Sequence, residues 1–147
     1  MKQAVFLILP ILAGVGLALQ PLLNTRVATP LGSPLWAAAI SFVVGTLGLF
    51  LAILAARAAV PELGRFSDVP PVAWSAGLLG AFFVIVTILA VPQIGTASLI
   101  ALVIAGQIIA AIALDHFGIM QVPKPASIER LLGGVILIIG AVLVVRQ

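Results

Sequence analysis

The feature that most constrains this chain is a long apolar run over residues 95–118. An α-helix crosses the hydrocarbon core of a bilayer in about 20 residues, so the run is long enough to span a membrane. A single amide, Gln107, lies near its middle, and Asp115 and His116 lie near its end. The run therefore predicts a membrane-spanning helix that carries a few polar groups.

The composition extends this prediction to the whole chain. Hydrophobic residues make up 63% of the 147 residues and charged residues 7%, whereas soluble domains average about 25% charged residues. The net charge of +3 comes from few residues, so we interpret it as a signal of membrane topology and not of nucleic-acid binding. The chain has no cysteine, one histidine and four acidic residues. We therefore expect no catalytic site, no metal site and no cofactor.

Four further apolar runs bring the predicted membrane-spanning helices to five. The expected ranges are 3–24, 35–56, 72–91, 95–117 and 127–145. A proline-rich turn at 29–34 ends the first helix, and a charged loop at 57–71 follows the second. The link at 92–95 is so short that the helices on either side should be antiparallel. The sequence predicts an all-α integral membrane protein, with residues 1–147 in one compact membrane domain.

Small residues recur at helical spacing on several of these helices, which allows close helix approach in membranes. The stripe on the second helix comprises Ala37, Ser41, Gly45, Gly48, Ala52 and Ala55. Gly106 belongs to a similar line on the fourth helix, and Gly133 and Gly140 share a face of the fifth. The candidate residues for helix packing or a dimer interface are Ser41, Gly45, Gly48, Gly106, Gly133 and Gly140.

Four polar residues within the predicted spans are candidates for a substrate pathway, because polar groups in a membrane are costly. Gln20 and Asn24 share one face of the first helix; the alternative is a helix end with solvated amides. Gln107 is central in its span, and its alternative role is an interhelical hydrogen bond. Asp115 could line a vestibule as a proton- or cation-linked group. The alternative is an interfacial pair with His116, stabilised by the helix dipole.

The basic residues predict an orientation. With five spans, one side carries Lys2, Arg57, Arg65, Lys124 and Arg130, and the other carries Arg26 and Arg146. The positive-inside rule then places the N-terminus in the cytoplasm and the C-terminus outside.

Several stretches resemble the YdcZ family of small bacterial membrane proteins, in the drug/metabolite transporter superfamily. They are LQPLLN at 19–24, GSPL at 32–35, SFVVGT at 41–46, GQ at 106–107 and DHFG at 115–118. The resemblance implies a five-helix transporter unit in the bacterial inner membrane, with Asn24, Gln107 and Asp115 at the family's characteristic polar positions. Small multidrug members of the superfamily use a glutamate in the first helix. This chain has no acid there, which argues against proton-coupled export of cations.

The resemblance also implies an assembly, because larger superfamily members contain two five-helix halves in inverted orientation with substrate between them. We expect this chain to be one half of a ten-helix dimer, either with a second copy or with an oppositely oriented paralogue. The expected function is transport, in the export direction, of a small polar or amphipathic molecule by alternating access. The alternatives are an accessory membrane subunit with no transport activity of its own, and a channel, for which flux without saturation is expected.

Overall fold

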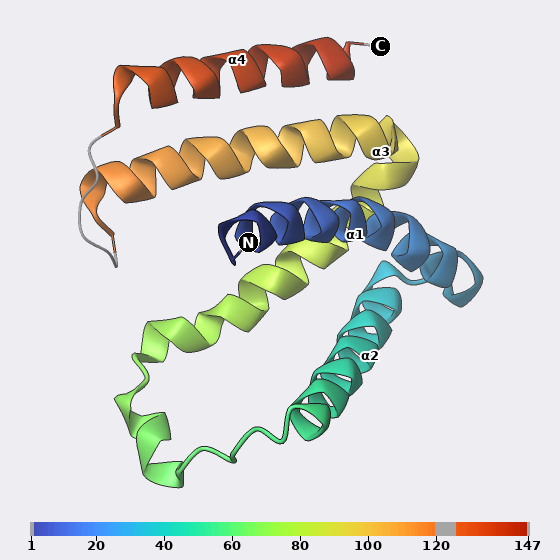
Figure 1. Cartoon of the computed structure of the whole chain (residues 1–147). Helices are drawn as coiled ribbons and strands as arrows, with labels where there is room; N and C mark the ends of the chain where they lie inside the picture. The colour runs from blue at the N-terminus through green and yellow to red at the C-terminus, as the bar shows by residue number, and fades with distance from the viewer. Residues whose placement is uncertain (1, 120–125, 147) are drawn as a thin grey trace. The chain divides into compact units, whose positions relative to one another are not determined.

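The computed structural model describes residues 2–119 and 126–146 (Figure 1). Within these ranges it is helical and has no β-strand, which confirms the all-α prediction. The elements are α1 (Lys2–Leu31), α2 (Pro34–Ala55), η1 (Leu63–Asp68), η2 (Pro71–Ser75), α3 (Ala76–Phe117) and α4 (Ile128–Val145). Lys124, which the orientation argument uses, lies outside the described residues.

Within the described residues, four helical segments are long and apolar enough to cross a membrane: Ile8–Leu31, Pro34–Ala55, Pro71–Phe117 and Ile128–Val145. The third contains 47 residues, more than twice the roughly 20 that one crossing needs. It is broken at Gly95, whose φ of 75° and ψ of 165° lie in a region that is essentially restricted to glycine. We therefore interpret this segment as two spans. The link expected at 92–95 takes the form of a kink inside α3.

The first helix is longer than its sequence predicts, because α1 continues past Asn24 to Leu31. Thr25 and Thr29 donate their hydroxyl hydrogen bonds to the carbonyls of Pro21 and Thr25, at 2.8 and 2.9 Å. Their hydroxyls are thus satisfied inside the helix. The expected turn is reduced to a helix cap, in which Gly32 has a φ of 62° and Ser33 N–H donates to the Ala28 carbonyl at 3.3 Å.

Contacts along the chain define two compact units, which divide between Pro92 and Gln93. The first unit holds α1, α2 and the beginning of α3. Its core is formed where these helices meet, by Ala28, Ala37, Ala38, Val84 and Ile88. Gly80 lies against the Phe42 ring, which is 3.5 Å from the position of a Cβ on that glycine. Beyond this contact, α2 and α3 diverge toward the loop that joins them (Figure 1).

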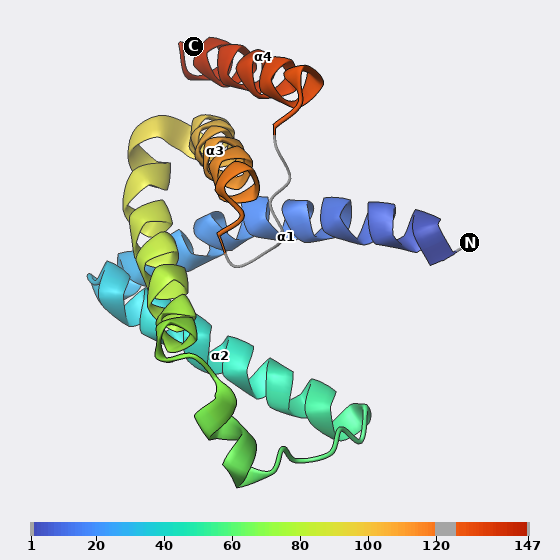
Figure 2. The ribbon, with the colours of Figure 1, turned by 90° about the vertical axis from the view of Figure 1, so that its left-hand side faces the viewer.

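The second unit is a hairpin of the rest of α3 and α4, which run antiparallel (Figures 1 and 2). Ser127 caps α4, since its hydroxyl accepts a hydrogen bond from Arg130 N–H at 3.4 Å. The helices pack through Gly134, where an added Cβ would lie 3.0 Å from the Ile112 Cδ1 and 3.5 Å from the Ile108 Cγ2. The single five-helix bundle expected from the sequence stays a prediction.

Candidate functional site

The first unit contains a groove between α1 and α2 that we call the amide groove. Its volume is about 320 Å³, and its lining residues are Gln20, Ser41, Phe42, Gly45, Thr46 and Leu49. Gln20 comes from α1 and is half-buried, whereas the others come from α2. Three polar side chains therefore face a space between two apolar helices. Gln20, Ser41 and Gly45 are among the candidates predicted from the sequence. Thr46 is not, although it lies next to Gly45 within the stretch that resembles the family.

The small-residue stripe of α2 explains why this groove is open. Ala37, at the start of the stripe, is buried in the core at 1% exposure. Gly45 and Gly48 are exposed, and an added Cβ at either would have no described atom within 4 Å. Within the first unit, the stripe therefore packs at its beginning and is open further along. Close contact at Gly45 and Gly48 with a partner stays a prediction.

Asn24 lies on α1 one turn after Gln20 and is buried, with 7% of its surface exposed. Its Nδ2 has no hydrogen-bond partner among the described residues. The buried Thr87 differs, since its hydroxyl donates to the Val84 carbonyl at 2.9 Å. A buried donor without a partner costs about 1–3 kcal/mol. A solvated helix end does not describe Asn24, because it is buried and α1 continues beyond it. Within the described chain, the Asn24 amide nitrogen can therefore still donate a hydrogen bond to a ligand, a water molecule or a partner chain.

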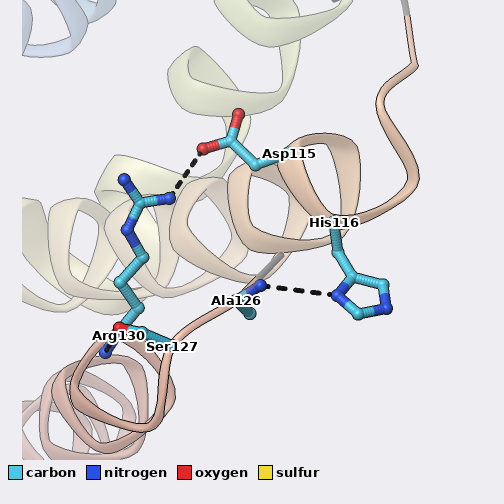
Figure 3. Close-up of polar contacts among 5 residues, drawn as sticks. All are labelled: Asp115, His116, Ala126, Ser127 and Arg130. Carbon is cyan, nitrogen blue, oxygen red and sulfur yellow. Dashed lines mark hydrogen bonds and ion pairs between the residues drawn. The ribbon is translucent and has the colours of Figure 1, made fainter. Parts of the chain in front are cut away.

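The second unit carries an ion pair between the end of α3 and the start of α4 (Figure 3). Arg130 Nη1 donates to Asp115 Oδ2 at 3.2 Å, and the two side chains are 52% and 41% exposed. His116 points away from Asp115, and its Nδ1 accepts a hydrogen bond from Ala126 N–H at 3.5 Å. Figure 3 shows that these neighbours contact different parts of the chain, as expected for consecutive helix residues. Asp115 is thus partnered by a cation of α4 and not by the adjacent histidine.

Two grooves run along the α3–α4 hairpin on either side of the contact between Ile112 and Gly134. One, of about 440 Å³, is apolar and has His116 and Phe117 in its lining. The other, of about 300 Å³, is lined by Asp115 and Arg130 together with apolar residues. We call the second one the ionic groove.

Gln107 and the remaining glycine candidates also lie in the second unit. The Gln107 side chain is exposed, and Gly106, Gly133 and Gly140 have no atom of the described residues within 4 Å of an added Cβ. Gly134, in contrast, packs against Ile112 and Ile108, although it was not among the candidates predicted from the sequence. Gln20 and Asn24 belong to the first unit, so their convergence with Gln107 on one pathway stays a prediction.

The part of the chain covered by residues 2–119 and 126–146 contains no group of three or more His, Cys, Asp or Glu side chains that could hold a metal ion.

Comparison with known proteins adds evidence that the geometry alone does not provide. Residues 5–143 match the family described as "Putative inner membrane exporter, YdcZ". The chain is 34% identical over 150 residues to the inner membrane protein YdcZ of Escherichia coli K12, and the match covers 100% of this chain and 99% of that protein. No solved structure matches. Because both matches extend over nearly the whole chain, the protein belongs to the YdcZ family of inner membrane exporters.

Proposed function

We propose that the chain exports a small polar or amphipathic molecule across the bacterial inner membrane, and that the amide groove is part of its pathway. The family membership supports export in general. The proposal adds a substrate class, a dimeric assembly and alternating access.

The observation that carries the proposal is the juxtaposition of a polar groove with a buried, unpartnered amide. Gln20, Ser41 and Thr46 line the groove, and Asn24 lies one turn further along α1 with its Nδ2 unpaired among the described residues. Neutral donors and acceptors between apolar helices can bind a polar solute without the desolvation cost of a full charge. A groove of about 320 Å³ also lies within the usual range for small-molecule sites.

The test is secretion from cells. Metabolites in the medium of cells that overproduce the protein would be compared by mass spectrometry with those from cells that produce an equal amount of Asn24→Ala or Gln20→Ala. We expect at least one small molecule to accumulate outside the wild-type cells, and each variant to lose most of that excess. Saturable counterflow of the molecule in proteoliposomes would separate a transporter from a channel. Equal secretion by wild type and both variants would contradict the assignment of the groove.

The proposed assembly is a dimer, in which Gln107 and the open glycines Gly45 and Gly48 contact the partner. Reporters fused to Gln147, one active only in the cytoplasm and one only outside, test the arrangement. Signal from the external reporter alone supports a parallel homodimer or an oppositely oriented paralogue, as the charge bias predicts. Comparable signal from both would instead establish dual topology and favour an antiparallel homodimer.

The alternative function, an accessory subunit, would give a different result in the same cells. It predicts no secretion difference between wild type and the empty cell, together with stoichiometric co-purification of a larger membrane protein.

A further inference from the structure

The ionic groove has the form of a site for an amphipathic molecule. Asp115 and Arg130 lie at one end of it, and Ile108, Ile112 and Leu137 supply apolar wall. Gly133 also lines it, and an added Cβ there would have no described atom within 4 Å. One end of the groove is therefore charged, and the rest of its wall is apolar. Because Gly133 has no side chain, the space beside it in the groove is open.

The ion pair at the charged end can form further hydrogen bonds. Within the described chain, Arg130 Nη1 and Asp115 Oδ2 make the single side-chain contact between the two residues, at 3.2 Å. Asp115 Oδ1 and the other guanidinium nitrogens remain for further hydrogen bonds. Both side chains are about half exposed, and exposed ion pairs contribute little to stability. A ligand can therefore separate this pair at low cost.

The opposite charges of Asp115 and Arg130 indicate what net charge a ligand of this groove should carry. An anion that takes Arg130 would leave Asp115 without its cation, and a cation that takes Asp115 would leave Arg130 without its anion. A zwitterion replaces both partners at once, so no charge is left unpaired in the groove. The nearby His116 contacts the backbone of Ala126 and lines the other groove, so it does not compete for either end.

The length of the groove limits the apolar part of the ligand. Arg130 and Leu137 are seven residues apart on α4, which corresponds to about 10 Å of helix. A lipid chain crosses one leaflet, about half of the roughly 30 Å hydrocarbon core. The groove is therefore shorter than a lipid tail but long enough for the side chain of an apolar amino acid.

We propose that the ionic groove binds a small zwitterion with an apolar tail, of the α-amino acid type. Its ammonium group would contact Asp115, its carboxylate Arg130, and its tail Ile112 and Leu137. This second site is distinct from the amide groove, and the assignment of its ligand as the exported molecule rests on the transport proposal.

The test is direct binding to the purified full-length protein in detergent. Isothermal titration would use leucine, valine, methionine and phenylalanine as probes, with isocaproate and isoamylamine as leucine analogues that lack the ammonium or the carboxylate group. We expect saturable binding of at least one amino acid. If leucine binds, both of its analogues should bind at least about tenfold more weakly; if another probe binds, its own deaminated and decarboxylated analogues take their place.

The variants locate the site. Asp115→Asn and Arg130→Gln should each weaken binding at least about tenfold, and Gly133→Leu should abolish it by filling the groove from a position where an added Cβ has no described atom within 4 Å. The matched control is the exposed pair of Glu62 and Arg65, at 3.6 Å. Glu62→Gln and Arg65→Gln should leave binding unchanged.

Three outcomes would overturn the inference: no saturable binding of any amino acid probe, equal binding of a singly charged analogue, or binding that survives Asp115→Asn and Arg130→Gln. A fourth outcome that would overturn the inference can be measured by native mass spectrometry. If a phospholipid stays bound to the wild-type protein but is lost from Arg130→Gln, the groove is a lipid site. Binding without any secretion difference would leave this site standing and contradict the transport proposal.

Discussion

In the first unit, Asn24 is 7% exposed and its Nδ2 has no partner among the described residues. In the second unit, Asp115 and Arg130 are about half exposed and paired at 3.2 Å. The two units thus differ in what each keeps available: a buried neutral donor in one and an easily separated ion pair in the other. A neutral amide can remain unpaired in an apolar region at a moderate cost, whereas a full charge there requires a partner or water.

The largest effect is expected at Gly95, where α3 is kinked. Gly95→Ala places a side chain in a backbone conformation that is essentially restricted to glycine, which costs up to about 3 kcal/mol. The control is Gly106→Ala in the regular part of α3, where an added Cβ meets nothing within 4 Å; this change should stabilise the helix by about 0.5–1 kcal/mol. Unfolding in SDS, followed by circular dichroism, measures both. A Gly95→Ala protein as stable as the wild type would show that the kink is not required.

The next effect separates the two adjacent glycines of α4. Gly134→Leu forces a side chain against Ile112, whose Cδ1 is 3.0 Å from the added Cβ, and should cost about 2 kcal/mol by overpacking. Gly133→Leu instead adds a side chain where a Cβ has no described atom within 4 Å, and should raise the free energy of unfolding by up to about 0.5–1 kcal/mol because it removes a glycine from the helix. The same unfolding assay measures both variants. If Gly133→Leu is the more damaging of the two, Gly133 is packed against a partner that the single chain lacks.

A smaller effect, with the opposite sign, is expected at Asn24. Asn24→Leu removes a buried donor that has no partner among the described residues, so the free energy of unfolding should rise by about 1 kcal/mol. Secretion should fall at the same time, since a functional polar group is lost. Thr87→Val is the control, because the Thr87 hydroxyl already has an acceptor at 2.9 Å and its removal should give no gain. A destabilised Asn24→Leu would indicate that the amide has a partner in the assembled protein.

The smallest effect on stability is expected at the ion pair. Asp115→Asn should change the free energy of unfolding by less than about 1 kcal/mol, because the pair is exposed. Thermal unfolding in detergent at low and high salt measures the change, and any difference from wild type should shrink as salt screens the charges. A loss of several kcal/mol would mean that the pair holds the hairpin closed, and the contrast between the two units would then disappear.

The sequence by itself determined the membrane class, the helical fold and the approximate positions of the spans. These follow from local properties, namely long apolar runs separated by short polar or proline-rich segments. The polar candidates were also identifiable, because an amide or a carboxylate in an apolar run is conspicuous. The kink at Gly95 was expected as a link between helices from the nearby proline and glycine.

Tertiary structure decided how these residues are used. Helical spacing cannot distinguish Gly134, which packs against Ile112, from Gly133, which faces a groove. It also cannot show that Asp115 is paired with Arg130, which lies on another helix, or that the stripe of α2 opens into a groove beyond Ala37 and Ala38. Each of these depends on which face of a helix meets its neighbour. Packing between segments that are distant in sequence determines which face this is, and a local sequence pattern does not contain that information.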